Sequence, residues 1–418
     1  MMTISRRAMA PIPTRSARRH TYFWLMLLCV LPPVGCHHST APRANQARTR
    51  GRQALAIKHY DSAIAEYTEI IRLDPADAMA YNNRGFAYYK KGEFDKAIAD
   101  FNEAIGRNPK LAAAYCNRGL AYRDKGESDE VIDDFTMAIR LDPADALAYN
   151  NRGLAYYEKG DVDKALADFG EAIRLDPKAA EAYSNRSLAH QKNGELDKAI
   201  ADCTEAIRLD PRNAAAYNNR GLVYYDQGDL DRAVADYNEA IRRDPKFVRA
   251  YTNRSLAHQK NGKWDEAIAD CTEAIRLDPA DAFARNNRGF AYYKKGEFDK
   301  AIADFDEAIG RNPTLAQAYS NRGLAHRGKG ESDDAIEDFT KAIGLDSADA
   351  IAYNNRGLAY NEKGDFDLAI ADYTEAIRLN PRADAAYWNR GLAHRKKGEK
   401  SEADEDFEQA KKLGHQEK

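Results

Sequence analysis

The chain has 418 residues, of which 44% are hydrophobic and 31% are charged. This balance suits helices with one buried stripe and one solvated face, and it excludes a disordered chain and a polytopic membrane protein. Because 63 Lys and Arg stand against 66 Asp and Glu, the net charge of −3 gives no overall field that would hold the protein on nucleic acid or on an acidic membrane. No nucleic-acid partner is expected, and partners must be recognised locally.

Residues 1–36 have the layout of a secretory signal peptide. Residues 1–20 contain five arginines and no acidic residue, and an unbroken apolar run, Tyr22–Leu31, follows them. As a helix, this run would span about 15 Å, roughly half of the hydrocarbon core of a bilayer. A lasting transmembrane helix is therefore not expected.

Cys36 is a candidate for lipidation. The segment Val34-Gly35-Cys36 resembles the lipobox of bacterial lipoproteins, with Pro33 where that family prefers leucine. The resemblance implies that the cysteine is acylated and becomes the new N-terminus. We therefore expect an exported protein of the cell envelope, either membrane-anchored through the lipid or periplasmic or extracellular. The alternative is an uncleaved tether to the membrane. Residues 37–43 are predicted to be a linker.

From residue 44 onward the sequence repeats with a period of 34. The segment Tyr81–Gly85 recurs at residues 149–153, 217–221 and 353–357. If Gly85 is counted as position 8, an aromatic residue recurs at position 11, Ala at 20 and 27, and Pro at 32. The array runs to residue 417, and its units start at residues 44, 78, 112, 146, 180, 214, 248, 282, 316, 350 and 384.

Each unit is predicted to be a pair of antiparallel helices. Between Ala78 and Lys91 the apolar residues lie three and four apart, and Gly92 can adopt the left-handed conformation that ends a helix. A second helix follows and is stopped by Pro109. One pair of about 14-residue helices cannot enclose a core, so neighbouring units must cover each other.

These positions match the tetratricopeptide repeat pattern, and the chain resembles that family over residues 44–417. The resemblance implies an all-α fold, a right-handed α-solenoid of about eleven helix-turn-helix repeats. It also implies a concave groove, formed by the first helices, that binds an extended peptide or protein through positions 2, 5, 6, 9, 12 and 13. No phosphate loop, nucleophile elbow or zinc spacing occurs, so no enzyme activity, catalytic residue or cofactor is expected.

Position 6 is Asn in ten consecutive repeats. A row of side-chain amides can pair with the main chain of a peptide whatever its sequence, and this row resembles the asparagine ladder of the O-linked N-acetylglucosamine transferase. The alternative is that each amide satisfies nearby backbone or side chains. The predicted ligand-binding ladder is Asn83, Asn117, Asn151, Asn185, Asn219, Asn253, Asn287, Asn321, Asn355 and Asn389.

Position 12 alternates between Tyr and a polar residue, so the groove is expected to repeat every two units. Exposed tyrosines are good anchors for peptide side chains. The alternative is partial burial against the next first helix. The predicted anchors are Tyr89, Tyr157, Tyr225 and Tyr293.

Other recurring polar residues are predicted to be structural. Position 7 is Arg and position 23 is Asp in the same ten repeats, and we expect an ion pair between them in every interior repeat. Four histidines take position 11 but lie 68 residues apart, too far for one metal site, so no metal is expected: His190, His258, His326 and His394. Cysteines at positions 24 and 5 are too distant to form disulfides: Cys203, Cys271 and Cys116.

The sequence thus predicts a non-enzymatic scaffold that gathers a protein partner at the cell envelope. Two alternatives remain open at this stage. One is a glycan-facing or structural component of an envelope assembly or secretion complex. The other is a cytosolic scaffold of the same fold.

Overall fold

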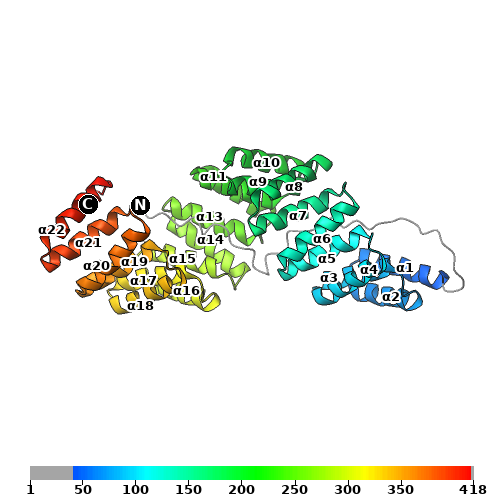
Figure 1. Cartoon of the computed structure of the whole chain (residues 1–418), viewed down its shortest axis with the longest axis horizontal. Coiled ribbons are helices and arrows are strands. Elements are labelled where there is room, and N and C mark those ends of the chain that lie inside the picture. The colour runs from blue at the N-terminus through cyan, green and yellow to red at the C-terminus, as the bar shows by residue number, and fades with distance from the viewer. Residues whose placement is uncertain (1–40, 416–418) are drawn as a thin grey trace. The chain divides into compact units, whose positions relative to one another are not determined.

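The computed structural model describes residues 41–415, which form 22 α-helices and no strand (Figure 1). The chain divides into two compact units, and the boundary between Val223 and Tyr224 falls inside α11 (Ala214–Gln227). The other helices before this boundary are α1 (Ala41–Ala56), α2 (Tyr60–Leu73), α3 (Ala78–Lys91), α4 (Phe94–Arg107), α5 (Ala112–Lys125), α6 (Ser128–Leu141), α7 (Ala146–Lys159), α8 (Val162–Leu175), α9 (Ala180–Lys192) and α10 (Leu196–Leu209). Those after it are α12 (Leu230–Arg243), α13 (Val248–Lys260), α14 (Trp264–Leu277), α15 (Ala282–Lys294), α16 (Phe298–Arg311), α17 (Ala316–Lys329), α18 (Ser332–Leu345), α19 (Ala350–Lys363), α20 (Phe366–Leu379), α21 (Asp384–Lys397) and α22 (Lys400–Lys412).

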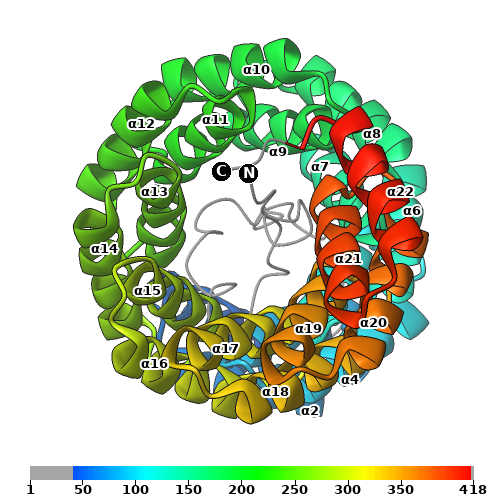
Figure 2. The ribbon, with the colours of Figure 1, turned by 90° about the vertical axis from the view of Figure 1, so that its left-hand side faces the viewer.

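Within each unit the helices form hairpins that stack in chain order. The second helix of one hairpin packs against the first helix of the next, as α4 does against α5 and α16 against α17. First helices of adjacent hairpins also approach each other, as α15, α17 and α19 do in the second unit. In Figure 2 these three helices lie on the inner side of the stack, and α16, α18 and α20 lie on the outer side. The predicted all-α solenoid of helix-turn-helix repeats is confirmed.

One predicted boundary is wrong. The linker was expected to extend to residue 43, but α1 begins at Ala41. Pro42 does not prevent this, because the first turn of a helix has no internal partner for the missing N–H. The predicted signal peptide, Cys36 and the rest of the linker lie outside the described residues. None of the helices in residues 41–415 combines the length and apolar character that a membrane crossing requires.

The core of each hairpin depends on the match between positions 8 and 24. Position 24 is a fully buried aromatic ring in most repeats, such as Phe305, and position 8 is Gly. A Cβ atom on Gly289 would lie 2.7 Å from Cε1 of Phe305, closer than van der Waals contact allows. The two repeats with Ser at position 8, Ser187 and Ser255, have Cys in place of the ring. The small cysteine at position 24 therefore leaves room for a serine side chain at position 8.

The residue that precedes each first helix alternates from repeat to repeat between one that can cap the helix and one that cannot, much as position 12 alternates. The carboxylates of Asp77, Asp145, Asp281 and Asp349 accept hydrogen bonds from the backbone N–H groups of the second or third residue of their helices. Helices between them start after residues that cannot cap, such as Leu111 and Ala179. A period of two repeats is thus present in the local structure of the array.

Candidate binding surface

The candidate surface is the face of the odd-numbered helices that carries positions 2, 5, 6, 9, 12 and 13. Each of these positions lies three or four residues from another of them, which places the set on one side of a helix. We call this face the inner face, because in Figure 2 it belongs to the inner row of helices in the second unit. Its side chains fall into two groups, those that bridge adjacent repeats and those that remain open to solvent.

The amides at position 6 bridge adjacent repeats. The Nδ2 atom of Asn117 donates to Oδ1 of Asn82 at 2.9 Å, and Asn185 donates in the same way to Asn150 at 3.0 Å. The same bond joins Asn321 to Asn286 and Asn389 to Asn354, both at 3.0 Å. Asn219 donates to Ser184 Oγ at 3.1 Å. The partner is always the residue at position 5 of the preceding repeat.

The remaining amides have varied surroundings. Asn151 donates to the carbonyl oxygen of Leu147 at 2.9 Å and accepts from Arg123 at 3.0 Å, so both ends of this amide are engaged. Asn355 is buried, and Asn83, Asn253 and Asn287 are half-buried. These contacts match the alternative that the sequence left open, in which the amides satisfy neighbouring groups. Binding of a ligand by the side-chain amides at position 6 stays a prediction.

The tyrosines at position 12 also lie at junctions between repeats. Tyr225 is only 3% exposed, and burial raises the pKa of its hydroxyl to about 12. Tyr89 donates to Asp124 of the next repeat at 2.9 Å. The ammonium of Lys192 lies 5.1 Å from the ring centre of Tyr157, and Tyr293 packs beside Phe298 with 5.9 Å between ring centres. Their role as peptide anchors remains untested, and these contacts show partial burial against neighbouring groups.

The positions of the inner face that are most open to solvent are 2 and 13. Leu147 and Ile351, both at position 2, are 38% and 44% exposed. Position 9 is Leu or Phe in ten repeats and is half-buried in most of them, and position 13 carries exposed charges of both signs, such as Lys260 and Glu362. The sequence signal for this surface was a large apolar residue at position 2, where the first helix has no neighbour to cover it.

The predicted pairing of positions 7 and 23 is confirmed in nine repeats. In each, the Nε and a terminal nitrogen of the guanidinium bind both oxygens of the carboxylate, as Arg322 binds Asp338 at 2.9 and 2.6 Å. The remaining pairs are Arg84–Asp100, Arg118–Asp134, Arg152–Asp168, Arg186–Asp202, Arg254–Asp270, Arg288–Asp304, Arg356–Asp372 and Arg390–Asp406. These pairs join the two helices of one hairpin.

A second set of ion pairs, which the sequence pattern had not indicated, joins seven repeats to the one before them. Lys at position 14 binds Asp at position 18 of the preceding repeat, as Lys329 binds Asp299 at 3.0 Å. The others are Lys91–Asp61, Lys125–Asp95, Lys159–Asp129, Lys295–Asp265, Lys363–Asp333 and Lys397–Asp367. In the repeats that start at residues 180, 214 and 248, position 14 is Asn or Gln.

The histidines at position 11 are half-buried and contact carboxylates. The Nδ1 atoms of His190, His326 and His394 lie 2.6 to 2.7 Å from Glu195, Glu331 and Glu399, each at position 16 of the same repeat. His258 has Lys263 at that position, and burial lowers the pKa of its imidazole. Cys203 and Cys271 are buried as expected, and the cysteines among the described residues are free thiols.

The comparisons with known proteins agree with this architecture. Family models described as tetratricopeptide repeat match residues 78–111, 184–248, 252–316, 320–373 and 384–413. A model described as TPR repeat matches residues 51–92, 119–160, 153–194 and 357–398. Together these matches extend over most of the array.

Solved structures of the same fold have low sequence identity. The crystal structure of the APC/C hetero-tetramer Cut9-Hcn1 includes a chain that is 15% identical, with a TM-score of 0.52 over 90% of this chain and 94% of that one. The human IFIT1 dimer with m7Gppp-AAAA is 15% identical, with a TM-score of 0.50 over 81% of this chain and 91% of that one. At such identities the likeness concerns the fold alone.

Proposed function

This chain belongs to the tetratricopeptide repeat family, and on that premise we propose that it is a non-enzymatic scaffold that binds an extended polypeptide along its inner face at the cell envelope. The observation that supports this most is the exposure of Leu147 and Ile351 at position 2, beside the half-buried Leu and Phe of position 9. Apolar side chains that a repeat protein leaves open on its concave row of helices are suited to bind the side chains of a partner. The exposed charges at position 13 would select among partners.

The repeat that starts at residue 350 allows the binding face to be tested with a matched control. Ile351 on α19 is 44% exposed, and Leu368 on α20, in the other row of helices, is 51% exposed. A photoreactive residue at Ile351 is expected to form a protease-sensitive cross-linked product in cells, and the same residue at Leu368 is expected to form none. A protease-resistant product would favour a glycan ligand, and equal products from both sites would contradict the proposed face.

Once the cross-linked partner is identified, its affinity can be measured directly. Ile351→Asp is expected to weaken binding by about tenfold, because it removes one buried aliphatic contact of about 1.5 kcal/mol. Leu368→Asp, which makes the same change on the other row, is expected to leave the affinity unchanged. Calorimetric titration of the partner into each variant measures both values.

We propose further that the chain is exported and carries a lipid at Cys36. The support is the sequence of residues 1–36, with its basic start, apolar run and cysteine after a small residue. Cells that express the full chain are expected to incorporate labelled palmitate into it, and Cys36→Ser is expected to abolish the label. Labelling that persists in the variant would contradict acylation at this cysteine, and a wild-type chain that stays unlabelled in the cytosol would favour the cytosolic alternative.

A further inference from the structure

A recurring arrangement of three side chains surrounds the turn of four hairpins, those of the repeats that start at residues 78, 146, 214 and 282. Position 11 supplies a ring, position 16 a carboxylate and position 19 a cation, which lies against both. The Lys96 ammonium is 2.7 Å from Glu93 and 5.4 Å from the ring centre of Tyr88. Lys300 lies 2.6 Å from Glu297 and 5.4 Å from the ring centre of Tyr292. Repeats 146 and 214, named by their first residues, have the same arrangement around Lys164 and Arg232.

The repeat that starts at residue 180 keeps the cation but changes the ring. His190 stands at position 11 and lies 2.6 Å from Glu195, while Lys198 at position 19 lies 2.8 Å from the same carboxylate. A positive charge at position 19 is therefore present beside Tyr in four repeats and beside His in this one. Its location beside a carboxylate and a ring is a feature of the hairpin rather than of one repeat.

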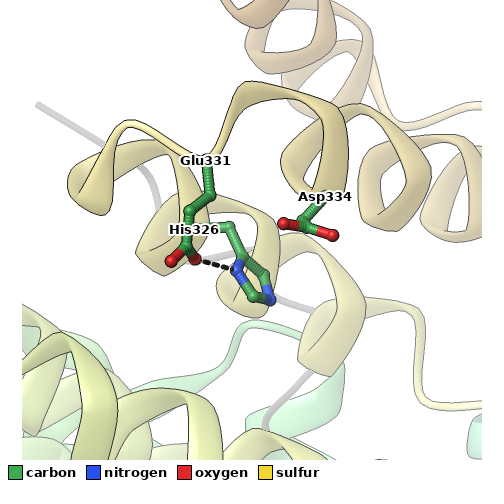
Figure 3. Close-up of side chains that lie close together, drawn as sticks. All are labelled: His326, Glu331 and Asp334. Carbon is green, nitrogen blue, oxygen red and sulfur yellow. Dashed lines mark hydrogen bonds and ion pairs between the residues drawn. The ribbon is translucent and has the colours of Figure 1, made fainter.

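In the repeat that starts at residue 316, a carboxylate takes the place of the cation. Position 19 is Asp334, which is exposed, while His326 and Glu331 occupy the other two positions. One ligand atom from each of these three side chains lies within 4.8 Å of the others, and Figure 3 shows both carboxyl groups close to the imidazole ring. Among the described residues this is the one such group of three. An imidazole and two carboxylates thus surround the location where other repeats hold an ammonium or a guanidinium.

We propose that this location binds a divalent cation of the Zn²⁺ type, held by His326, Glu331 and Asp334. The ligand set fits, because imidazole nitrogen selects zinc and similar transition metals over calcium and magnesium. Tetrahedral bonds of about 2.1 Å from zinc place neighbouring ligand atoms about 3.4 Å apart. His326 Nδ1 and Glu331 Oε2 therefore have to separate slightly, and a rotation of the exposed Asp334 side chain has to bring its carboxylate closer. Three protein ligands leave one position for water.

The hydrogen bond at this location shows where the ion would go. His326 Nδ1 lies 2.7 Å from Glu331 Oε2, so these two atoms already face the same point. An ion bound there would replace this hydrogen bond with two bonds to the metal. Lys329 also contacts Glu331, at 2.8 Å, but Lys295 contacts Glu297 in the same manner, and that carboxylate still binds a second cation, Lys300. The wide spacing of the histidines excludes a site shared between repeats, but not one completed within a repeat.

The test compares the zinc content of three full-length proteins by equilibrium dialysis. Asp334→Lys restores the residue type found at position 19 in other repeats, and it is expected to hold one zinc ion fewer than the wild type. Lys198→Asp creates the same three ligands around His190, and it is expected to hold one zinc ion more. Other zinc ligands, including His37 and His38, are common to all three proteins and cancel.

Circular dichroism establishes that each variant retains the helical content of the wild type. Equal zinc content in the wild type and Asp334→Lys would overturn the proposal. A lack of additional zinc in Lys198→Asp would overturn the inference that an aspartate at position 19 completes the site beside His and Glu. Because neither measurement involves a protein partner, the result is independent of the proposed scaffold function.

Discussion

Arg322→Ala is expected to lower the free energy that protects α17 and α18 from opening by about 3 kcal/mol, because it leaves a buried carboxylate without its counter-charge. Asp338 is only 5% exposed at its side chain, and Arg322 binds both of its oxygens. Hydrogen exchange of the amides in these two helices measures the loss, which corresponds to exchange that is roughly a hundredfold faster.

The loss in this variant should depend on pH in a defined direction. Burial already raises the pKa of Asp338, and Arg322 opposes that effect. Without Arg322 the pKa of the folded protein rises further above that of the unfolded chain. The protonated carboxyl is tolerated at low pH, so destabilisation is smallest there and grows as the pH rises through the folded-state pKa.

Arg378→Ala provides the control for this prediction. Arg378 pairs with Glu375 one turn away on the same helix, and the two side chains are 65% and 32% exposed. Surface pairs of this kind contribute little to stability. Exchange in α20 is therefore expected to stay unchanged, and an equal loss in both variants would contradict the role assigned to the buried pairs.

The second large effect concerns positions 8 and 24. Gly289→Ser is expected to destabilise its hairpin by about 2 kcal/mol, because the new Cβ overlaps the ring of Phe305 in a core that is already full. Phe305→Cys alone is expected to cost about 3 kcal/mol through the cavity that it leaves. Each loss can be measured by hydrogen exchange of α15 and α16.

The variant with both Gly289→Ser and Phe305→Cys is expected to lose less stability than the sum of the two single losses. Ser with Cys is the natural combination at Ser187 and Cys203 and at Ser255 and Cys271, where the same two positions face each other. The serine side chain occupies part of the space that the ring vacates. Strict additivity of the two losses would contradict this explanation of why the residues change together.

The sequence predicted the hairpins well because their determinants are local. Gly92 does adopt a left-handed conformation at the end of α3, with φ of 80°, and Asp100 and Arg84 meet because both face the interior of one helix pair. Relations within a hairpin follow from helix periodicity, which a single sequence displays.

Relations between repeats were harder to predict. Whether Tyr225 projects into a groove or is covered depends on the distance between adjacent first helices. The repeat length of 34 residues does not determine that distance. The surroundings of the Asn117 amide likewise depend on Asn82, which accepts its hydrogen bond and stands 35 residues earlier. The Lys329–Asp299 pair could have been anticipated from complementary charges 30 residues apart, but only after the stacking was known.

The ion pairs between positions 14 and 18 make the junctions of the array unequal. Seven junctions have a lysine that reaches back to the preceding repeat, and at three others the residue is a neutral amide. Dissolved ions screen contacts between exposed charges. High salt therefore weakens the junctions that have the lysine and leaves those with the neutral amide nearly unaffected. The relative stiffness of successive segments is therefore set partly by the ionic strength of the medium around the protein.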